Sequence, residues 1–297
     1  MSLFEQRRLL ALKAIEQALD KEFPVSADDP ASKLTEAMRY SLLGGGKRIR
    51  GYLLMEFCAL CGGTWEKALP YAAGIEMMQA FSLIHDDLPC MDDDNLRRGK
   101  PTNHVVYGEA TAMLAGDALS IRSFKALAEN PLCTPEQNAL AVAVLAEATA
   151  EQGMCGGQTM DLESEHLVLT YNVLEKLVER KTGALFAASC ELGCIAAGAG
   201  AKERMMARRF AFNSGLAFQI ADDLLDLHAT AEQLGKTPGK DLRDEKNTFP
   251  ALLGEKEARE KAIRLCAAAN ELLAVFPDGK PKEALTEYCD FIMSRNY

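Results

Sequence analysis

The sequence of 297 residues predicts an all-α protein that forms a single domain, 1–297. Apolar residues recur at helical spacing almost from end to end, as Leu12, Ile15 and Leu19 do near the start. No stretch alternates apolar and polar residues with β-branched enrichment for more than a few positions, so we expect no substantial sheet. Glycine and proline fall between the periodic segments, where they end one helix or open the next.

Four helices are expected in the first third of the chain, at residues 3–22, about 30–43, about 48–61 and 65–87. The second should end at Gly44-Gly45-Gly46, because glycine readily adopts the left-handed turn found at helix C-termini. Pro89 disfavours helical backbone at Leu88, so the chain should leave the fourth helix at that point.

The same pattern continues through the rest of the chain. Expected helices cover about 107–129, a segment opened by Thr134-Pro135-Glu136-Gln137, about 171–198, about 202–229, and a shorter pair at the end, the last opened by Pro281. In the Thr134 segment, threonine is the N-cap, proline takes the first helical position and glutamine the third. No linker-like or low-complexity segment divides the chain, which is why we expect one domain.

Composition limits the classes of function. With 48% hydrophobic and 26% charged residues, the chain resembles an ordinary globular protein rather than a disordered one. A net charge of −10 argues against nucleic acid or an anionic membrane as the main partner. No run approaches the roughly 18 apolar residues of a membrane span, and residues 1–23 mix charge with Leu and Ala, unlike a signal peptide.

The nine cysteines are too dilute for a disulfide scaffold. Most lie in apolar, helix-like segments, which suits reduced thiols packed in a core and a cytoplasmic location. Cys58-Ala59-Leu60-Cys61 matches half of a zinc or redox motif, but a second pair at zinc spacing is missing. We therefore expect these two cysteines to pack in the core.

Two clusters of aspartate are the most unusual feature of the sequence. The first follows an apolar helix and contains Asp86, Asp87, Asp92, Asp93 and Asp94; the second lies inside a later helix and contains Asp222, Asp223 and Asp226. Residues three and four apart share a helix face, so the second cluster should gather three carboxylates. Like charges at this spacing cost roughly 0.2–0.5 kcal/mol per pair, which points to a bound cation.

The chemistry of the clusters indicates a magnesium–phosphate site, with Mn²⁺ as a possible substitute. Mg²⁺ takes one or two carboxylates and completes its shell with water and phosphate oxygens. Basic residues accompany both clusters: Lys47, Arg48 and Arg50 after the triple glycine, Arg97 and Arg98 after the first cluster, and Lys181, Lys236, Lys240 and Lys246 around the second. The alternatives are solvated acidic helix ends and, for 97–100, a surface salt-bridge patch.

These features resemble the trans-isoprenyl diphosphate synthase family over essentially the whole chain, most closely bacterial farnesyl diphosphate synthase (geranyltranstransferase). The shared segments, in the family order, are GGGKRIR (44–50), SLIHDDLPCMDDDNLRRGKPTNH (82–104), AGDALS (115–120), GMCGGQTMDL (153–162), KTGALF (181–186), FQIADDLLD (218–226) and GKDLRDEKNTFPALLG (239–254). The resemblance implies an all-α fold around a deep central cavity, a homodimer, and condensation of isopentenyl diphosphate with an allylic diphosphate such as dimethylallyl or geranyl diphosphate.

The resemblance also implies roles for individual residues. About three Mg²⁺ ions would be held by Asp86, Asp87, Asp92, Asp222 and Asp223, with Asp226 as helper. The allylic diphosphate would contact Arg97, Lys181 and Lys236, with Lys246 nearby, and the acceptor diphosphate Gly46, Lys47, Arg50, Gln79 and Arg98. Thr182 and Gln219 would face the allylic cation, and released pyrophosphate would take the proton. His85 itself precedes the first cluster on an apolar helix, so we expect it to serve in packing or in support of the site.

Product length depends on the helix before Asp86. Phe81 and Ser82 lie about one turn below the cluster, and five helical residues rise about 7.5 Å, so a ring there would close the cavity after a short product. In the resembling family, an aromatic residue here, together with the two-residue insertion between Asp87 and Asp92, goes with C15 farnesyl diphosphate. We expect C15; the alternative is C20 geranylgeranyl diphosphate, because the segment PCMD resembles plant enzymes.

Other classes fit the sequence less well. A metal phosphohydrolase of the HD type needs a histidine upstream of His85, which is the first of four. A terpene cyclase needs no acceptor site such as GGGKRIR, and a calcium-binding loop needs a glycine at its sixth position, which the first cluster lacks. A non-catalytic scaffold subunit would typically have lost one aspartate cluster, and both are present.

Overall fold

The structure is a computed structural model that describes residues 1–164, 166–228 and 247–294. Its helices are α1 Leu3–Glu22, α2 Ser32–Leu42, α3 Ile49–Leu60, α4 Trp65–Asp86, α5 Asn103–Tyr107, α6 Glu109–Ala128, α7 Pro135–Thr149, α8 Met154–Glu163, α9 Tyr171–Val178, the π-helix η1 Glu179–Gly183, α10 Ala184–Ala197, α11 Ala201–His228, α14 Phe249–Leu253, α15 Glu255–Leu272, the 3₁₀-helix η2 Leu273–Val275 and α16 Lys280–Ser294. The strands in these residues are β1 Leu96–Arg97 and β2 Lys100–Pro101, an antiparallel ribbon. The predicted all-α fold is confirmed.

Local signals placed several helices correctly. The first helix has the predicted bounds, and Thr64 caps α4 by accepting a hydrogen bond from the N–H of Lys67 at 3.4 Å. At the start of α7, Thr134 Oγ1 accepts from the N–H of Gln137 at 3.2 Å, while Gln137 Oε1 accepts from the N–H of Thr134 at 2.9 Å. Two backbone donors of this helix terminus are therefore satisfied by the capping box, as the sequence predicted.

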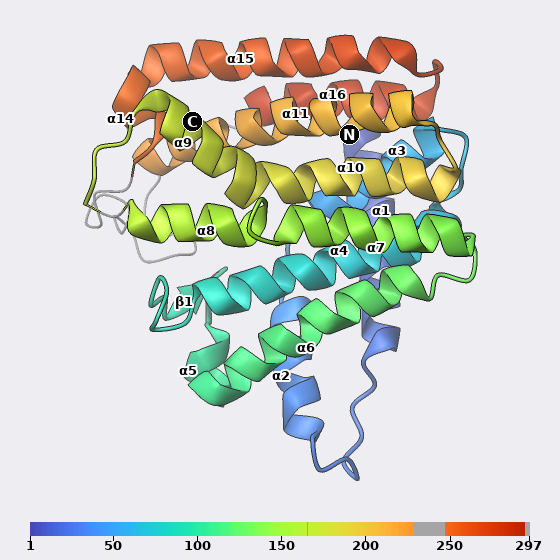
Figure 1. Cartoon of the computed structure of the whole chain (residues 1–297), viewed down its shortest axis with the longest axis vertical. Coiled ribbons are helices and arrows are strands. Elements are labelled where there is room, and N and C mark those ends of the chain that lie inside the picture. The colour runs from blue at the N-terminus through green and yellow to red at the C-terminus, as the bar shows by residue number, and fades with distance from the viewer. Residues whose placement is uncertain (165, 229–246, 295–297) are drawn as a thin grey trace.

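The structure also departs from the predicted helices. The helix expected at about 107–129 is found as α6, but the short helix α5 before it was not predicted; Gly108, whose φ is +86°, separates the two. The helix expected at 171–198 is one run whose middle, η1, is π-helical; Figure 1 shows the run change direction between α9 and α10. Helix α8 was not predicted, and α15 is longer than the expected short element.

Helices α4 and α10 lie at the centre of the stack (Figure 1). Helix α10 packs against α3, α4, α7 and α11, and it is buried from Leu185 to Ala196. Such a helix is apolar on every side because no side faces water. Cys58 and Cys190 belong to this interior, and all nine cysteines are free thiols. Cys58 is buried in α3, and Cys61, the residue that follows this helix, is partly buried against the core, as expected.

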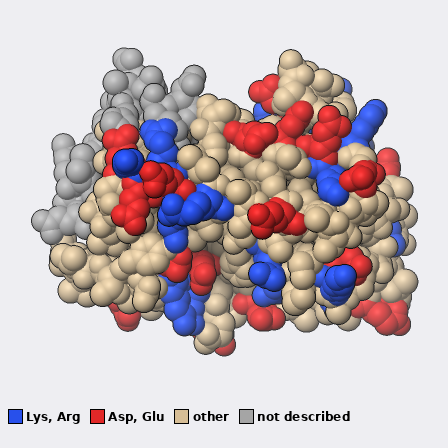
Figure 2. Space-filling view, turned by 90° about the horizontal axis from the view of Figure 1, so that it is seen from above, with Lys and Arg blue, Asp and Glu red and all other residues tan. Residues whose placement is uncertain are grey.

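The outer face of α15 is charged, with neither sign dominating. Seen from above (Figure 2), acidic and basic side chains are interspersed over this face. Glu255 and Arg259 are 3.4 Å apart, and Glu260 and Arg264 3.8 Å apart, each pair four residues apart on the helix. Exposed pairs of this kind stabilise a helix only slightly, so the face is a solvated helix surface. Among the described residues, no helix combines the length and apolarity needed to cross a membrane.

A buried ion pair between α1 and α3 makes folding stability depend on pH. Glu56 is fully buried, and its two carboxylate oxygens accept from Arg7 Nε at 2.8 Å and Arg7 Nη2 at 2.9 Å. Burial raises the pKa of Glu56 from 4.5 to about 7, although Arg7 opposes the shift. Between these values the folded chain holds a proton that the unfolded chain has released, so this residue lowers the free energy of unfolding as pH rises.

We therefore expect Glu56→Gln to gain stability relative to the parent chain as pH increases. From pH 5 to pH 8 the difference in unfolding free energy should move in favour of the variant by roughly 2–3 kcal/mol, because the glutamine has no proton to lose. Urea denaturation of both proteins at several pH values measures this difference. A difference that stays constant, or moves the other way, would contradict it.

Candidate active site

The first aspartate cluster is assembled by a chain reversal at the end of α4. The backbone N–H of Asp92 donates to the carbonyl of Asp86 at 2.9 Å, and that of Asp94 donates to the carbonyl of Asp87 at 3.2 Å. The reversal brings the later aspartates back beside the earlier ones. All of them then lie at a helix C-terminus, where the helix dipole is unfavourable to negative charge.

Burial makes this cluster costly to ionise. It raises the pKa of Asp86 to about 6, with further contributions from Asp92 and Asp87, while Lys181 and Arg97 act in the opposite direction. Burial also raises the pKa of Asp87. A cation bound among these carboxylates would offset both effects, and their hard oxygen atoms are donors that Mg²⁺ prefers.

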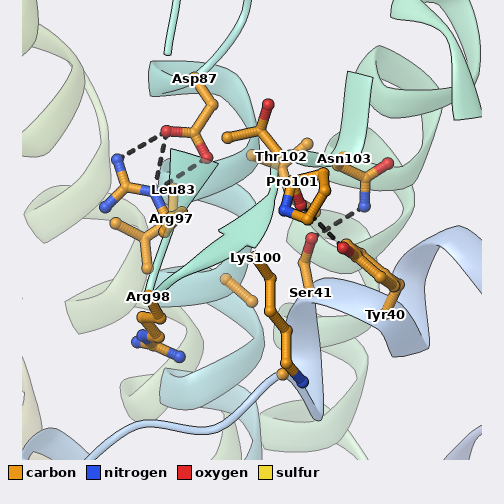
Figure 3. A pocket seen from close by; sticks show the side chains of 13 residues that line it. Tyr40, Ser41, Leu83, Asp87, Arg97, Arg98, Lys100, Pro101, Thr102 and Asn103 are labelled. Atoms are coloured by element: carbon orange, nitrogen blue, oxygen red, sulfur yellow. Dashed lines mark hydrogen bonds and ion pairs between the residues drawn. The ribbon is translucent and has the colours of Figure 1, made fainter. Parts of the chain in front are cut away.

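Two consecutive arginines in the β ribbon face different parts of the site. Arg97 Nη2 lies 2.6 Å from Asp87 Oδ1, and Arg97 Nε lies 2.8 Å from both oxygens of the same carboxylate. Figure 3 shows Arg97 directed at Asp87, with Arg98 on the opposite side near Lys100. The left-handed backbone of Arg98, with φ of +53°, accompanies this change in direction.

Arg98 belongs to a second basic group around the triple glycine. Its guanidinium donates to the carbonyl of Gly45. Gly46 has φ of +130°, a backbone conformation that favours glycine, and a Cβ there would also lie 2.9 Å from the guanidinium nitrogens of Arg98, which would have to move. Lys47 is exposed, with its ammonium 5.9 Å from the ring centre of Phe291.

Arg50 completes this group from the first turn of α3. Its guanidinium lies 4.4 Å from the ring centre of Phe186 on α10. Burial lowers the pKa of Arg50 to about 10, so the residue stays charged at neutral pH. The charge of Asp222 acts on Arg50, which connects this group with the second aspartate cluster. Gln79 is half-buried on α4, about two turns before Asp86.

Two further residues predicted for the site, Lys181 and Thr182, lie in the π-helical turn η1. A π-helical turn widens the helix by one residue and is frequent at functional sites. Lys181 Nζ donates to Asp161 Oδ2 on α8 at 2.5 Å. Helix α8 approaches so closely that a Cβ at Gly157 would lie 2.1 Å from the backbone nitrogen of Lys181. Asp161, whose role the sequence did not reveal, therefore orients Lys181.

The second cluster lies on α11, and its members differ in environment. Asp223 Oδ1 accepts from Gln219 Nε2 at 2.9 Å, and Oδ2 accepts from the N–H of Phe249 at 3.1 Å, at the start of α14. Burial raises the pKa of Asp223 to about 7, and the charges of Asp222 and Asp226 raise it further. Asp222 is half-buried and Asp226 is exposed. The charges of Asp222 and Asp226 therefore act on Asp223, but the three carboxylates do not form the converging group that their spacing predicted.

The two clusters supply the kind of donors that Mg²⁺ takes. Among the residues that the structure describes, no three Asp, Glu, His or Cys side chains converge on one point. Mg²⁺ does not need such a cage, since it binds one or two carboxylates and fills its remaining positions with water and phosphate. The residues therefore fit a metal held jointly with a phosphate ligand. Lys236 and Lys246, also predicted for this site, lie outside the described residues.

Below the first cluster, α4 is fixed against α6. His85 Nε2 lies 3.0 Å from the carbonyl oxygen of Met113, so the packing role predicted for His85 agrees with the structure. The ring of Phe81 meets that of His85 edge-on, with centroids 4.7 Å apart. Ser82 Oγ donates to the carbonyl of Gln79 at 3.0 Å. Phe81 is thus half-buried and held one turn and a half below Asp86.

A pocket between α2, α4 and the ribbon contains residues that the sequence did not single out (Figure 3). Tyr40 Oη donates to the carbonyl of Pro101 at 2.8 Å. Asn103 Nδ2 donates at 2.8 Å to both the carbonyl of Ala37 and Ser41 Oγ. These bonds attach the ribbon, and with it Arg97, to α2. Asn103 lies within the resembling segment 82–104, whereas nothing local distinguishes Tyr40.

Comparisons with known proteins agree with this geometry. Residues 31–273 match the Polyprenyl synthetase family. The chain is 44% identical over 280 residues to geranylgeranyl pyrophosphate synthase 7, chloroplastic, of Arabidopsis thaliana, covering 93% of this chain and 80% of that one. It is 43% identical over 258 residues to farnesyl diphosphate synthase of Haemophilus influenzae, covering 86% and 87%. A crystal structure of an FPP/GFPP synthase from Zymomonas mobilis superposes with a TM-score of 0.87 at 36% identity, covering 98% and 99%.

The all-α fold, the family match and these relatives together identify a prenyltransferase of isoprenoid biosynthesis. The chain belongs to the Polyprenyl synthetase family.

Proposed function

We propose that this chain condenses isopentenyl diphosphate with dimethylallyl and then geranyl diphosphate, giving farnesyl diphosphate and pyrophosphate. The observation that carries the C15 assignment is Phe81. Its ring is half-buried five residues before Asp86 on α4, about 7.5 Å below the proposed metal site. A growing chain that extends from the diphosphate along α4 would meet this ring early.

About three Mg²⁺ ions, or Mn²⁺ in their place, would be held by carboxylates of the two clusters, Asp86, Asp87, Asp92, Asp222 and Asp223, with Asp226 as helper. When bound, the metal supplies positive charge where the departing diphosphate oxygen becomes negative. Two side chains of the protein would add positive charge beside the departing diphosphate. Arg97 is positioned by Asp87, and Lys181 is positioned by Asp161. Lys236 and Lys246 would add to them.

A different group of residues would bind the acceptor diphosphate, apart from those proposed for the allylic diphosphate. Lys47, Arg50 and Arg98 gather around the triple glycine, with Gly46 and Gln79, and would bind the acceptor diphosphate, which must stay attached to its carbon. The Gln219 amide nitrogen donates to Asp223, which turns the amide oxygen the other way. That oxygen and Thr182 Oγ1 would face the allylic cation. His85 is engaged with α6, so the released pyrophosphate would take the proton.

Product analysis tests the chain-length assignment. Incubation with dimethylallyl and isopentenyl diphosphates should give C15 as the main product, and Phe81→Ala should shift the main product to C20 or longer, because the floor of the cavity is removed. Ser82→Ala, which removes a hydroxyl bonded to its own helix, is the matched control and should leave C15 dominant. Dominance of C20 from the parent chain would support geranylgeranyl diphosphate synthesis instead, the activity named for the Arabidopsis relative.

We also propose that the chain acts as a homodimer through α6 and α7. Leu114 and Ile121 are 57% and 69% exposed and lie seven residues apart on one face of α6, and Leu140 is exposed on the adjoining α7. An exposed apolar face shared by two packed helices is typical of a contact between subunits. The double variant Leu114→Glu/Ile121→Glu should elute as a monomer in size exclusion with light scattering, whereas Val168→Glu, on a loop, should not. A monomeric parent chain would contradict the proposal.

We propose a cytoplasmic enzyme whose residues 1–297 act as one domain. Nine free cysteines, several of them buried, suit a reducing compartment. The alternative of a non-catalytic scaffold subunit is disfavoured because both aspartate clusters are present with their cations. Release of pyrophosphate by the purified chain, given both substrates and Mg²⁺, is expected of the enzyme, and its absence would favour the scaffold subunit.

A further inference from the structure

Helix α3 begins without a cap of its own. Its N-cap residue is Arg48, which has left-handed backbone, φ of +50°, and makes no side-chain hydrogen bond to the first turn. The first N–H groups of a helix need acceptors from elsewhere. Glu76 of α4 supplies one, because its Oε1 accepts from the N–H of Gly51 at 2.9 Å. A carboxylate far away in the sequence thus replaces the missing cap.

The same carboxylate pairs with Arg48 itself. Arg48 Nη1 lies 3.4 Å from Glu76 Oε2, and both side chains are almost fully buried, with 4% and 5% exposed. Arg48 Nη2 donates to the carbonyl of Leu42 at 2.5 Å and lies 3.7 Å from Glu16 Oε1. The loop 43–48 is therefore tied to α1, α2 and α4 by one guanidinium, and Glu76 anchors that guanidinium from below.

This anchored loop carries the basic residues of the proposed acceptor site. Lys47 lies in the loop, Arg50 lies in the first turn of α3, and Arg98 donates to the carbonyl of Gly45 in the loop. Glu76 is near enough for its charge to act on both Arg50 and Arg98. A single buried carboxylate thus lies beneath a group of cations.

We infer that Glu76 is a positioning residue for the acceptor diphosphate. Together with Arg48 it fixes the loop 43–48 and the start of α3, so that Lys47, Arg50 and Arg98 present their charges in one arrangement. The inference rests on the proposed function, since it assigns these cations to isopentenyl diphosphate. Glu76 itself would not touch the substrate, because it is buried beneath the loop.

Steady-state kinetics with geranyl and isopentenyl diphosphates tests this role. Glu76→Ala removes both the cap and the ion pair, and it should raise KM for isopentenyl diphosphate about 20-fold or more. Glu76→Gln keeps an oxygen for the N–H of Gly51, so it should rescue most of the loss and leave a rise of about 3- to 5-fold. KM for geranyl diphosphate should stay within about twofold in both variants, because its proposed cations lie on other elements.

Glu56→Gln is the matched control. Glu56, on α3, is another buried carboxylate paired with an arginine, and it lies in the half of the helix remote from the loop. Its replacement tests what a general loosening of α3 does, and both KM values should stay within about twofold. A KM for isopentenyl diphosphate that is unchanged or lowered in Glu76→Ala, or both KM values rising in parallel, would overturn the inference.

The Glu76→Gln variant on its own and a binding measurement on the parent chain cover the cases in which kinetics of Glu76→Ala cannot be interpreted. If Glu76→Ala does not fold, Glu76→Gln decides alone, and a rise below about twofold counts against the inference. Calorimetric titration of the parent chain with isopentenyl diphosphate separates this inference from the proposed function. No binding and no product from the parent chain would reject the proposed function, whereas normal binding with unaffected variants would reject only the role of Glu76.

Discussion

Replacing Asp86 by asparagine should lower kcat by at least about 10³-fold, the loss expected when several kcal/mol of charge stabilisation disappear from the transition state. The amide keeps the shape of the side chain but removes its negative charge. Burial and its aspartate neighbours already disfavour the charged form of Asp86, so a cation bound there would offset that cost. Pyrophosphate release with geranyl and isopentenyl diphosphates, followed over a range of Mg²⁺ concentrations, measures the loss.

The matched control is Asp93→Asn. Asp93 belongs to the same chain reversal but is exposed, and asparagine tolerates its left-handed backbone, φ of +50°. This variant should retain activity within about threefold of the parent chain. Retention of more than a tenth of parental activity by Asp86→Asn would remove the first cluster from the chemistry.

The second large effect is expected at the π-helical turn. Lys181→Ala should lower kcat about 10²- to 10³-fold, the range measured when one preorganised donor to a developing anion is removed. The ammonium is held at 2.5 Å by Asp161 and is close enough to Asp86 to lower the pKa of that carboxyl, so its charge acts on the first cluster. Single-turnover measurements with both substrates bound isolate the chemical step.

Three further variants give this experiment its controls. Lys181→Arg keeps the charge and should recover part of the rate. Asp161→Asn leaves the ammonium in place but less firmly oriented, so its loss should be smaller than that of Lys181→Ala. Lys176→Ala removes an exposed lysine of α9 from the same helical run and should change kcat by less than about twofold. A Lys181→Ala rate within about fivefold of the parent would count against the proposed contact with the leaving group.

Much of this fold was accessible from local sequence. The bounds of α1 and the capping box at Thr134 follow from signals within a few residues. The π-helical turn η1 could not be predicted in this way, because it depends on how closely α8 packs against the backbone of Lys181 across Gly157. The hydrophobic period of a π turn differs from that of an α-helix by a single residue, which is lost within a long apolar run.

Part of the site was also predictable from local sequence. The composition and spacing of the aspartate clusters and of most basic residues were enough to predict them. Their partners were not predictable in this way: the pairs of Asp87 with Arg97 and Lys181 with Asp161 join elements whose approach is decided by tertiary packing. Glu76 left one trace in the sequence, as a lone acidic residue in an apolar stretch of α4, but its contact with Gly51 requires the fold.

The carboxylate of Asp223 has a consequence for how such an enzyme can diverge. It holds the Gln219 amide with one oxygen and the first turn of α14 with the other. Substitutions around Phe249 can therefore shift Gln219, the side chain proposed to face the reacting carbon, without replacing any aspartate of the two clusters. Substitutions in the short helix α14 can therefore change substrate or product selectivity while the aspartates of both clusters are retained.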